Sequence, residues 1–392
     1  MDFSKDEMSR RFKGLNEIME TNNLNGVIIM GDTVLNAPAI NVSQRYFTQN
    51  NLIESFQIMF CEKDGAPILI SASPLQYEAN KVRSQITDCV VSPRQIETLV
   101  EILREKNLCT GRIGCMLDMI PASWYIHLNR EVPELALVEI GRELTTLHYR
   151  KSNEEIEKAR TSAYMADKAD ESALAVIRPG RAEYEVTAEI EYVTNKLGAC
   201  KNFSLITSGN QRDIFANGIP KLYPASKRII ATQDSVILEI TPQFDGYWTQ
   251  LLRTICVSER PSIEMEVLHR VCVSAIKDTL SFITPGISAK DIWEKMNGYV
   301  TSQGFVLNRS LGHVASVDLV DDRLTADNTR QINCGEILIL HPCVGMKDGT
   351  QYFSWGQTYL VTKDGAMSLN QASDDLICVS GNVLSVKATQ GV

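Results

Sequence analysis

Two polar side chains end otherwise apolar segments of this chain. Glu239 closes the run VILE and His341 closes the run ILILH, and a proline follows each of them within three residues. A polar group at the end of a buried strand must find a hydrogen-bonding partner or face a cavity. A carboxylate can act as a base or bind a cation, and imidazole titrates near neutral pH, so both residue types suit proton transfer. We therefore take Glu239 and His341 as candidate site residues.

These two segments occupy matching places in an internal repeat. Residues 177–198 begin with the letters IRPG and end in glycine, and residues 283–304 begin with ITPG and end in glycine. Each unit follows a long helical pattern, carries an amphipathic one, and is followed by the apolar segment that ends in Glu239 or His341. We interpret this pattern as a duplicated α/β half with pseudo-twofold symmetry. Because ligand sites form where strand ends converge, the symmetry predicts both side chains at one site.

The chain upstream of the repeat has a different character. Helical patterns, such as that over residues 5–22, alternate there with short apolar segments such as residues 26–30. This alternation predicts an α/β layer domain. The character changes at Ser152, a candidate helix N-cap followed by two glutamates that suit the helix dipole. We expect one domain over residues 1–148 and a second over residues 149–392.

Length and composition limit the possible functions. The chain has 392 residues, which favours two domains, and its 44% hydrophobic content is enough for full cores. A net charge of −9 argues against a nucleic-acid or anionic-membrane partner, because such binding needs clustered Lys and Arg. The start of the chain is charged, no apolar run reaches membrane-spanning length, and the ten cysteines form no CxxC pair. We expect a cytoplasmic protein with reduced thiols.

Four segments resemble the creatinase/prolidase/aminopeptidase P family, in the order and spacing of that family. They are RKSNEEI at 150–156, IRPG at 177–180 with Glu183, DGYWTQLLRT at 245–254 and YLVTKDG at 359–365. The resemblance covers nearly the whole chain. It implies a creatinase-like N-terminal α/β domain and a pseudo-twofold pita-bread domain, an α/β (α+β) fold in all.

In the metallopeptidase members of that family, two Asp, one His and two Glu hold two divalent ions, which activate a water molecule. The resemblance places these ligands on Glu239, Gln250, His313, His341, and either Gly356 or Gln357. Only His313 is unchanged. Hard divalent ions need anionic oxygen, which a neutral Gln250 amide does not supply. We therefore expect no metal and no other cofactor, with a single divalent ion at Glu239, His313 and His341 as the alternative.

The metal-free branch, creatinase, offers another template. There the resemblance implies a proton-shuttling histidine and two glutamates that hold a guanidinium-type substrate. In this chain the three positions are Leu222, Leu252 and His341, which argues against creatine hydrolysis itself.

The polar and aromatic residues of these segments complete the candidate site. We assign Glu239, His313 and His341 to catalysis. Amides can orient a polar substrate, and aromatic faces can hold a cationic group. Arg253 is expected either in a structural pair or on a substrate carboxylate. The expected substrate-binding residues are Gln250, Gln357, Tyr247, Trp248, Phe203, Trp355, Arg253, Arg45 and Tyr46.

We expect a metal-independent hydrolase of a C–N bond in a small polar amino-acid or amidine-type substrate. Two alternatives remain: β-elimination on a small cationic substrate, and a peptidase-like binding protein without catalysis. The resemblance also implies a homodimer in which the N-terminal domain of one subunit, near Arg45 and Tyr46, completes the site of the other. The remaining expected partner is a small-molecule substrate.

Overall fold

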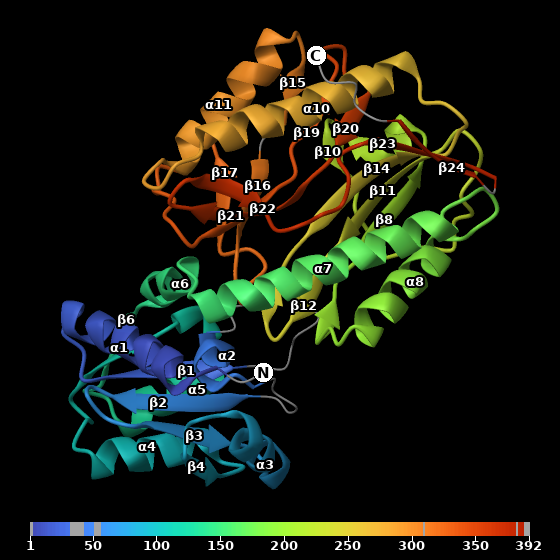
Figure 1. The fold of residues 1–392 in the computed structure, drawn as a ribbon. Helices are drawn as coiled ribbons and strands as arrows, with labels where there is room; N and C mark the ends of the chain where they lie inside the picture. The colour runs from blue at the N-terminus through green and yellow to red at the C-terminus, as the bar shows by residue number, and fades with distance from the viewer. Residues whose placement is uncertain (1–2, 32–42, 51–55, 309, 382, 388–392) are drawn as a thin grey trace. The chain divides into compact units, whose positions relative to one another are not determined.

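The computed structural model describes residues 3–31, 43–50, 56–308, 310–381 and 383–387, and it divides into two compact units, Met1–Tyr149 and Arg150–Val392 (Figure 1). This division lies one residue from the boundary that the sequence predicts. No helix of the described residues is long and apolar enough to span a membrane.

The N-terminal unit is built around one mixed sheet of six strands. Its strands are β1 (Gly26–Gly31), β2 (Gln57–Glu62), β3 (Pro67–Ser71), β4 (Asp88–Val91), β5 (Arg112–Cys115) and β6 (Ala136–Glu139). Its helices are α1 (Lys5–Thr21), α2 (Ser43–Thr48), α3 (Pro74–Arg83), α4 (Gln95–Glu105), α5 (Ala122–Glu131) and α6 (Gly141–Tyr149). The strand order is β4-β3-β2-β1-β5-β6, with β2 antiparallel to both of its neighbours. The apolar face of α4, with Leu99 and Leu103, packs in one buried cluster with Ile28 and Phe60 of the sheet. The predicted α/β layer domain is confirmed.

The C-terminal unit contains two helix pairs and two five-stranded sheets. Its helices are α7 (Asn153–Val176), α8 (Glu183–Lys196), α9 (Gln211–Ile214), α10 (Ile263–Phe282) and α11 (Ala289–Ser302). The first sheet comprises β8 (Leu205–Gly209), β11 (Ser235–Ile240), β14 (Leu251–Cys256), β23 (Leu376–Ser380) and β24 (Val383–Lys387), in the order β24-β23-β14-β11-β8. The second comprises β16 (Ser310–Ala315), β17 (Asp322–Thr325), β18 (Ile337–Leu340), β21 (Gln357–Thr362) and β22 (Gly365–Ser368), in the order β17-β16-β18-β21-β22. The pair α7 and α8 lies on one side of this unit and the pair α10 and α11 on the other, with strands between them (Figure 1).

The shorter strands of the C-terminal unit are β7 (Lys201–Asn202), β9 (Phe215–Ala216), β10 (Ile219–Pro220), β12 (Pro242–Phe244), β13 (Tyr247–Trp248), β15 (Val306–Leu307), β19 (Cys343–Gly345) and β20 (Tyr352–Ser354). They form one two-stranded sheet, β10-β9, and two three-stranded sheets, β13-β12-β7 and β15-β19-β20.

The start of α7 follows directly from its sequence. The Ser152 hydroxyl accepts the Glu155 N–H, and the Glu155 carboxylate accepts the Ser152 N–H, so two otherwise unpaired donors of the first turn are satisfied. This capping box fixes where the second unit begins.

The internal repeat is visible in the hydrogen bonds of both Pro-Gly turns. Gly180 and Gly286 have φ values of 91° and 94°, a region that glycine enters without steric cost. The Gly180 N–H donates to Ile230 O at 2.9 Å, and the Gly286 N–H donates to Ile332 O at 2.7 Å. Each turn is therefore attached to the segment that leads into a central strand, β11 in the first half and β18 in the second. The predicted duplication is confirmed.

Candidate functional site

The alternation of side chains along β11 separates the core from the site. Val236, Leu238 and Ile240 belong to the buried cluster that also contains residues of α7 and α8. Successive side chains of a strand point to opposite faces, so Glu239 lies on the face away from these helices. The strand continues one residue past Glu239, and the cross-strand partner of Glu239 is Leu252 of β14.

Glu239 is a buried carboxyl group with an unusual titration. Only 7% of the residue is exposed. Burial raises the pKa of Glu239 to about 7, and the neighbouring Gln250 amide, which lowers it, only partly offsets that effect. The Gln250 Nε2 also donates to Thr241 Oγ1 at 3.2 Å, whereas Gln250 Oε1 has no hydrogen-bond partner among the described residues. Glu239 can therefore exchange a proton near neutral pH, beside an amide oxygen that is free to accept one hydrogen bond.

The two site histidines share a face of the second sheet. His313 of β16 pairs with Ile339 of β18, and His341 follows two residues later on the same face. Their ring centroids lie 5.4 Å apart at an interplanar angle of 65°. Within the described part of the chain, His313 Nδ1 and His341 Nε2 are buried without a hydrogen-bond partner. Each ring therefore retains a buried nitrogen whose hydrogen-bonding capacity the described residues do not use.

Both imidazoles are neutral at physiological pH. Burial, with a smaller contribution from His341, lowers the pKa of His313 to about 3. Burial lowers the pKa of His341 to about 4. The imidazolium form is thus costly in this environment, and these rings act as neutral donors and acceptors of hydrogen bonds rather than as strong acids.

One main-chain bridge connects the two halves of the site. Leu252 and Gly356 exchange two backbone hydrogen bonds of 3.0 Å each. A Cβ atom at Gly356 would lie 2.5 Å from the Cβ of His341 and 2.2 Å from the carbonyl oxygen of Leu340. The strand partner of Glu239 therefore contacts a glycine that itself lies against His341. The structure brings Glu239, Gln250 and both histidines into one continuous region.

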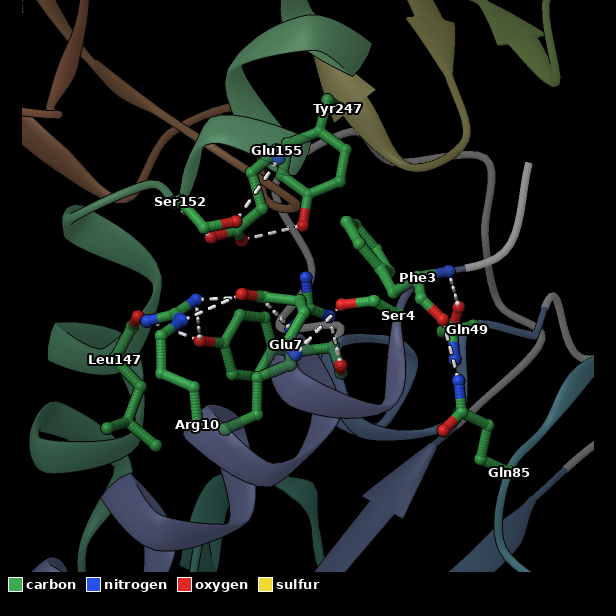
Figure 2. A network of polar contacts seen from close by, with 12 residues as sticks. Phe3, Ser4, Glu7, Arg10, Gln49, Gln85, Leu147, Ser152, Glu155 and Tyr247 are labelled. Atoms are coloured by element: carbon green, nitrogen blue, oxygen red, sulfur yellow. Dashed lines mark hydrogen bonds and ion pairs between the residues drawn. The ribbon is translucent and has the colours of Figure 1, made fainter.

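Two of the predicted aromatic residues belong to this region. Trp248 packs with Ala315 and Ile339, on the same face as His313, and Phe203 packs against the same cluster. Tyr247 has another contact: its hydroxyl donates to Glu155 Oε1 at 2.7 Å, as Figure 2 shows. This bond ties β13 to the capping box of α7.

Arg253 and Trp355 lie on the opposite face, contrary to our expectation for substrate binding. Arg253 alternates with Leu252 along β14, so its side chain points toward α7. There its Nε and Nη2 atoms contact Asp170 Oδ2 at 3.2 and 3.1 Å. The guanidinium carbon lies 5.7 Å from the centre of the Trp355 ring. Of the two roles expected for Arg253, the structure supports the buried ion pair.

Gln357 also lies on the face of the second sheet opposite the histidines, contrary to our expectation for substrate binding. It pairs with Leu340, whereas Thr358 pairs with Ile339 on the histidine face. Both ends of its amide are occupied, since Nε2 donates to Ala372 O at 2.7 Å and Oε1 accepts from Ser368 Oγ at 3.1 Å. The site-facing position of the two considered is therefore Gly356, which has no side chain.

Arg45 and Tyr46 are placed in the N-terminal unit, on α2. The guanidinium carbon of Arg11 lies 4.1 Å from the centre of the Tyr46 ring, and the Tyr46 hydroxyl donates to Leu147 O at 3.2 Å. Only 1% of Tyr46 is exposed. Tyr46 is thus a core residue of its own unit rather than a projecting substrate contact. In the same unit Gln49 Oε1 accepts the Phe3 N–H, and Glu7 accepts two bonds from Arg10 (Figure 2).

Leu222, at the position of the creatinase shuttle histidine, has apolar surroundings. Leu222 packs against the buried cluster of Ile214, Phe215, Ile237 and Cys343. No proton shuttle is possible at that position. Sequence reasoning overlooked Thr358, which bonds the main chain of Gln250, although alternation along the closing strand from Gly356 would have placed it on the site face.

The donor set does not fit two divalent ions. The family positions hold one carboxyl, one amide, two imidazoles and a glycine, so a single anionic side chain remains, which is too little to hold and bridge a pair of divalent ions. The space beside Gly356 is filled by His341. Among the described residues, Glu239, His313 and His341 do not form a group whose ligand atoms all lie within 4.8 Å of one another. These three side chains are therefore not arranged as a preformed site for one ion.

A creatinase-type domain followed by a duplicated α/β unit defines the class of two-domain pita-bread proteins. The chain belongs to metallopeptidase family M24, the family of creatinase, prolidase and aminopeptidase P. The model of metallopeptidase family M24 matches residues 157–363, and that of the creatinase/prolidase N-terminal domain matches residues 11–147.

Similar proteins and structures cover between two thirds and almost all of the chain. An Xaa-Pro dipeptidase of Pyrococcus furiosus is 24% identical over 375 residues, which are 94% of this chain and 100% of that protein. The uncharacterized peptidase YqhT of Bacillus subtilis is 22% identical over 68% of this chain and 74% of its own length. The solved structure of an Xaa-Pro dipeptidase from Bacillus anthracis has a TM-score of 0.82 at 20% identity and covers 95% of this chain and 100% of its own. The solved structure of the X-Pro aminopeptidase from Thermotoga maritima has a TM-score of 0.81 at 17% identity and covers 94% of this chain and 99% of its own. At such identities the structures establish the fold alone.

Proposed function

We propose that this protein is a hydrolase that cleaves a C–N bond in a small polar amino-acid or amidine-type substrate without a metal ion. The observation that carries the proposal is the position of Glu239, a carboxyl group with a pKa of about 7, in one region with two neutral imidazoles. A general base works best when its pKa lies near the operating pH. The relatives named as peptidases, which also cleave C–N bonds, support the reaction class.

Glu239 and the two histidines have separate roles in the proposed reaction. The Glu239 carboxylate takes a proton from water, whose oxygen attacks the electrophilic carbon of the substrate. An imidazole N–H of His313 or His341 donates a hydrogen bond to the atom that gains negative charge; a neutral imidazole can do this without first being protonated. The protonated Glu239 then returns the proton to the leaving nitrogen as the C–N bond breaks. One water is consumed and the carboxyl group regains its starting state.

Gln250 and Trp248 complete the proposed site. The free Oε1 of Gln250 accepts an N–H of the substrate, which suits amino, amide and amidine groups. Trp248 supplies an apolar wall beside His313. Self-association into a homodimer and a cytoplasmic location stay predictions.

The test is a substrate panel of creatine-like, betaine-like and Xaa-Pro compounds, assayed after chelator treatment and again with added Mn²⁺ or Zn²⁺. We expect turnover of at least one compound that metal does not raise, and incorporation of one labelled water oxygen into the product. Glu239→Gln should lower kcat by roughly 10²- to 10⁴-fold, the usual contribution of a positioned base. Glu294→Gln, an exposed glutamate of α11, is the matched control and should leave kcat unchanged.

Three results would contradict the proposal. An activity that appears only with metal would overturn its metal-free part, and wild-type turnover by Glu239→Gln would overturn the assigned base. An alkene product without oxygen from water would identify an elimination instead of a hydrolysis.

A further inference from the structure

The main chain of Gln250 is held by a side chain from the other half of the C-terminal unit. The Gln250 N–H donates to Thr358 Oγ1 at 2.9 Å, and Thr358 Oγ1 donates to the Gln250 carbonyl oxygen at 3.0 Å. One hydroxyl thus satisfies both backbone groups of a site residue. Neither Gln250 nor Thr358 is more than 3% exposed, so water does not replace these bonds readily.

This contact has a counterpart on the other side of the bridge between Leu252 and Gly356. At the bridge itself, backbone bonds backbone with two hydrogen bonds of 3.0 Å. Two residues further along, Thr254 Oγ1 donates to Ser354 O at 2.7 Å and accepts the Ser354 N–H at 3.2 Å. A threonine hydroxyl therefore bonds both backbone groups of the facing residue on each side of the bridge, and on the Thr358 side that residue is Gln250 of the site.

The backbone groups of Thr358 are bonded to other residues. Its N–H donates to Asn370 Oδ1 at 3.0 Å, and its carbonyl accepts the Leu369 N–H at 2.9 Å. Asn370 Nδ2 in turn donates to Asp167 Oδ1 of α7 at 2.9 Å, and Asp167 Oδ2 accepts the Gln371 N–H at 2.7 Å. A continuous series of hydrogen bonds thus runs from helix α7 of the first half through Thr358 to Gln250.

From this series we propose that Thr358 is a positioning residue: its hydroxyl fixes the main chain of Gln250 and thereby the direction of the Gln250 amide beside Glu239. The inference rests on the proposed function for its kinetic consequence only. Two features of the region depend on that direction, namely the bond from Gln250 Nε2 to Thr241 Oγ1 and the free Oε1. Thr358 itself contacts no reacting group. Its effect is to keep Gln250 in register with the histidines of the second sheet, on which Thr358 pairs with Ile339.

The decisive variant is Thr358→Val, which keeps the branched shape and removes the hydroxyl. Thr279→Val of α10 is the matched control, because Thr279 is equally buried but its hydroxyl only bonds Ala275 O within its own helix. Backbone hydrogen exchange of the peptide that contains Gln250 is the readout that needs no substrate. We expect faster exchange there in Thr358→Val, wild-type exchange in Thr279→Val, and restored protection in Thr358→Ser, which keeps the hydroxyl.

Kinetics on any substrate found by the panel give the second readout. A misdirected Gln250 should lower kcat by roughly 10- to 100-fold with little change in KM, because loss of positioning acts on the chemical step. Thr358→Ser should recover most of that loss, whereas a purely structural role would not distinguish serine from valine at equal stability. Asn370→Ala, which removes the acceptor of the Thr358 N–H and leaves the hydroxyl in place, covers the case in which Thr358→Val does not fold; it should change exchange and kcat in the same direction.

The outcomes separate this inference from the proposed function. If the panel yields no turnover, the proposed hydrolase fails, while exchange at Gln250 still decides whether Thr358 positions it. Wild-type protection of Gln250 in both Thr358→Val and Asn370→Ala would overturn the inference, as would equal kcat for Thr358→Val and the Thr279→Val control.

Discussion

Gly356→Ala is the smallest substitution that tests whether the carboxylate position of the family has been closed in this chain. The added Cβ would lie 2.2 Å from Leu340 O and 2.5 and 2.6 Å from the Cβ and Cα of His341. Real Cβ atoms do not approach other atoms so closely. All three neighbours are main-chain atoms or a Cβ, so no flexible side-chain tip can move aside. Gly356 itself is held by two hydrogen bonds to Leu252, which limits its own displacement.

The cost follows from these contacts. Overpacking of a well-filled core costs about 1–3 kcal/mol, occasionally more. Three close contacts with rigid atoms place Gly356→Ala near the upper end, at about 3 kcal/mol of unfolding free energy. For a domain of this size each kcal/mol lowers Tm by roughly 2–4 °C, so we expect a loss of roughly 6–12 °C for the C-terminal unit.

Thermal unfolding followed by calorimetry would measure this loss. Gly298→Ala is the control, because Gly298 lies exposed on α11 and its Cβ would meet nothing within 4 Å. Removing a helix-interior glycine should raise stability by about 0.5–1 kcal/mol, so the two substitutions have opposite expected signs. A Tm for Gly356→Ala at or above that of the parent would mean that the space beside His341 is open. The steric argument against a fifth metal ligand would then be wrong.

Two further predictions concern buried charge. Since the folded-state pKa of Glu239, about 7, lies above that of an unfolded glutamate, ionising Glu239 costs folding energy; stability attributable to this group is full at low pH and lost as pH rises toward 7. The unfolding free energy of Glu239→Gln should therefore rise relative to that of the parent by up to about 3 kcal/mol between pH 5 and pH 8. A difference in Tm between the two proteins that does not change with pH would refute this. Asp170→Ala leaves Arg253 buried without its partner and should lower the free energy of unfolding by about 3–5 kcal/mol. The double change Asp170→Leu with Arg253→Met removes both charges and should lower it clearly less. Equal losses for the two variants in urea unfolding would show that the unpaired charge is not the cause.

The fold was predictable because its evidence is local or periodic. The capping box at Ser152, the two Pro-Gly turns and the apolar segments before Glu239 and His341 each specify structure within a few residues. Glu239 and His341 could be paired because a repeat relates their segments. That inference needed no knowledge of which face each side chain occupies.

The errors arose where the face of a strand decides the role. Arg253, Trp355 and Gln357 stand beside site positions in the sequence, and an offset of one residue turns a side chain to the other face of a sheet. Tyr247 stands next to the site residue Trp248 in the sequence, but its hydroxyl is bonded to Glu155, 92 residues away. No local sequence pattern indicates such a partner.

Protonation was the other property that residue types could not provide. Histidine titrates near neutral pH in water, which made His313 and His341 plausible acids, but both lose that capacity when buried on an apolar strand face. The same burial moves Glu239 in the opposite direction, toward neutrality, because it disfavours whichever form is charged. One environment therefore exchanges the expected roles: the carboxyl group becomes the residue that can gain and lose a proton at physiological pH, and the imidazoles become fixed dipoles. Under the proposed function, Glu239 would supply a base near neutrality without a metal ion, and this would reconcile the neutral residues at positions 250, 341 and 356 with catalysis.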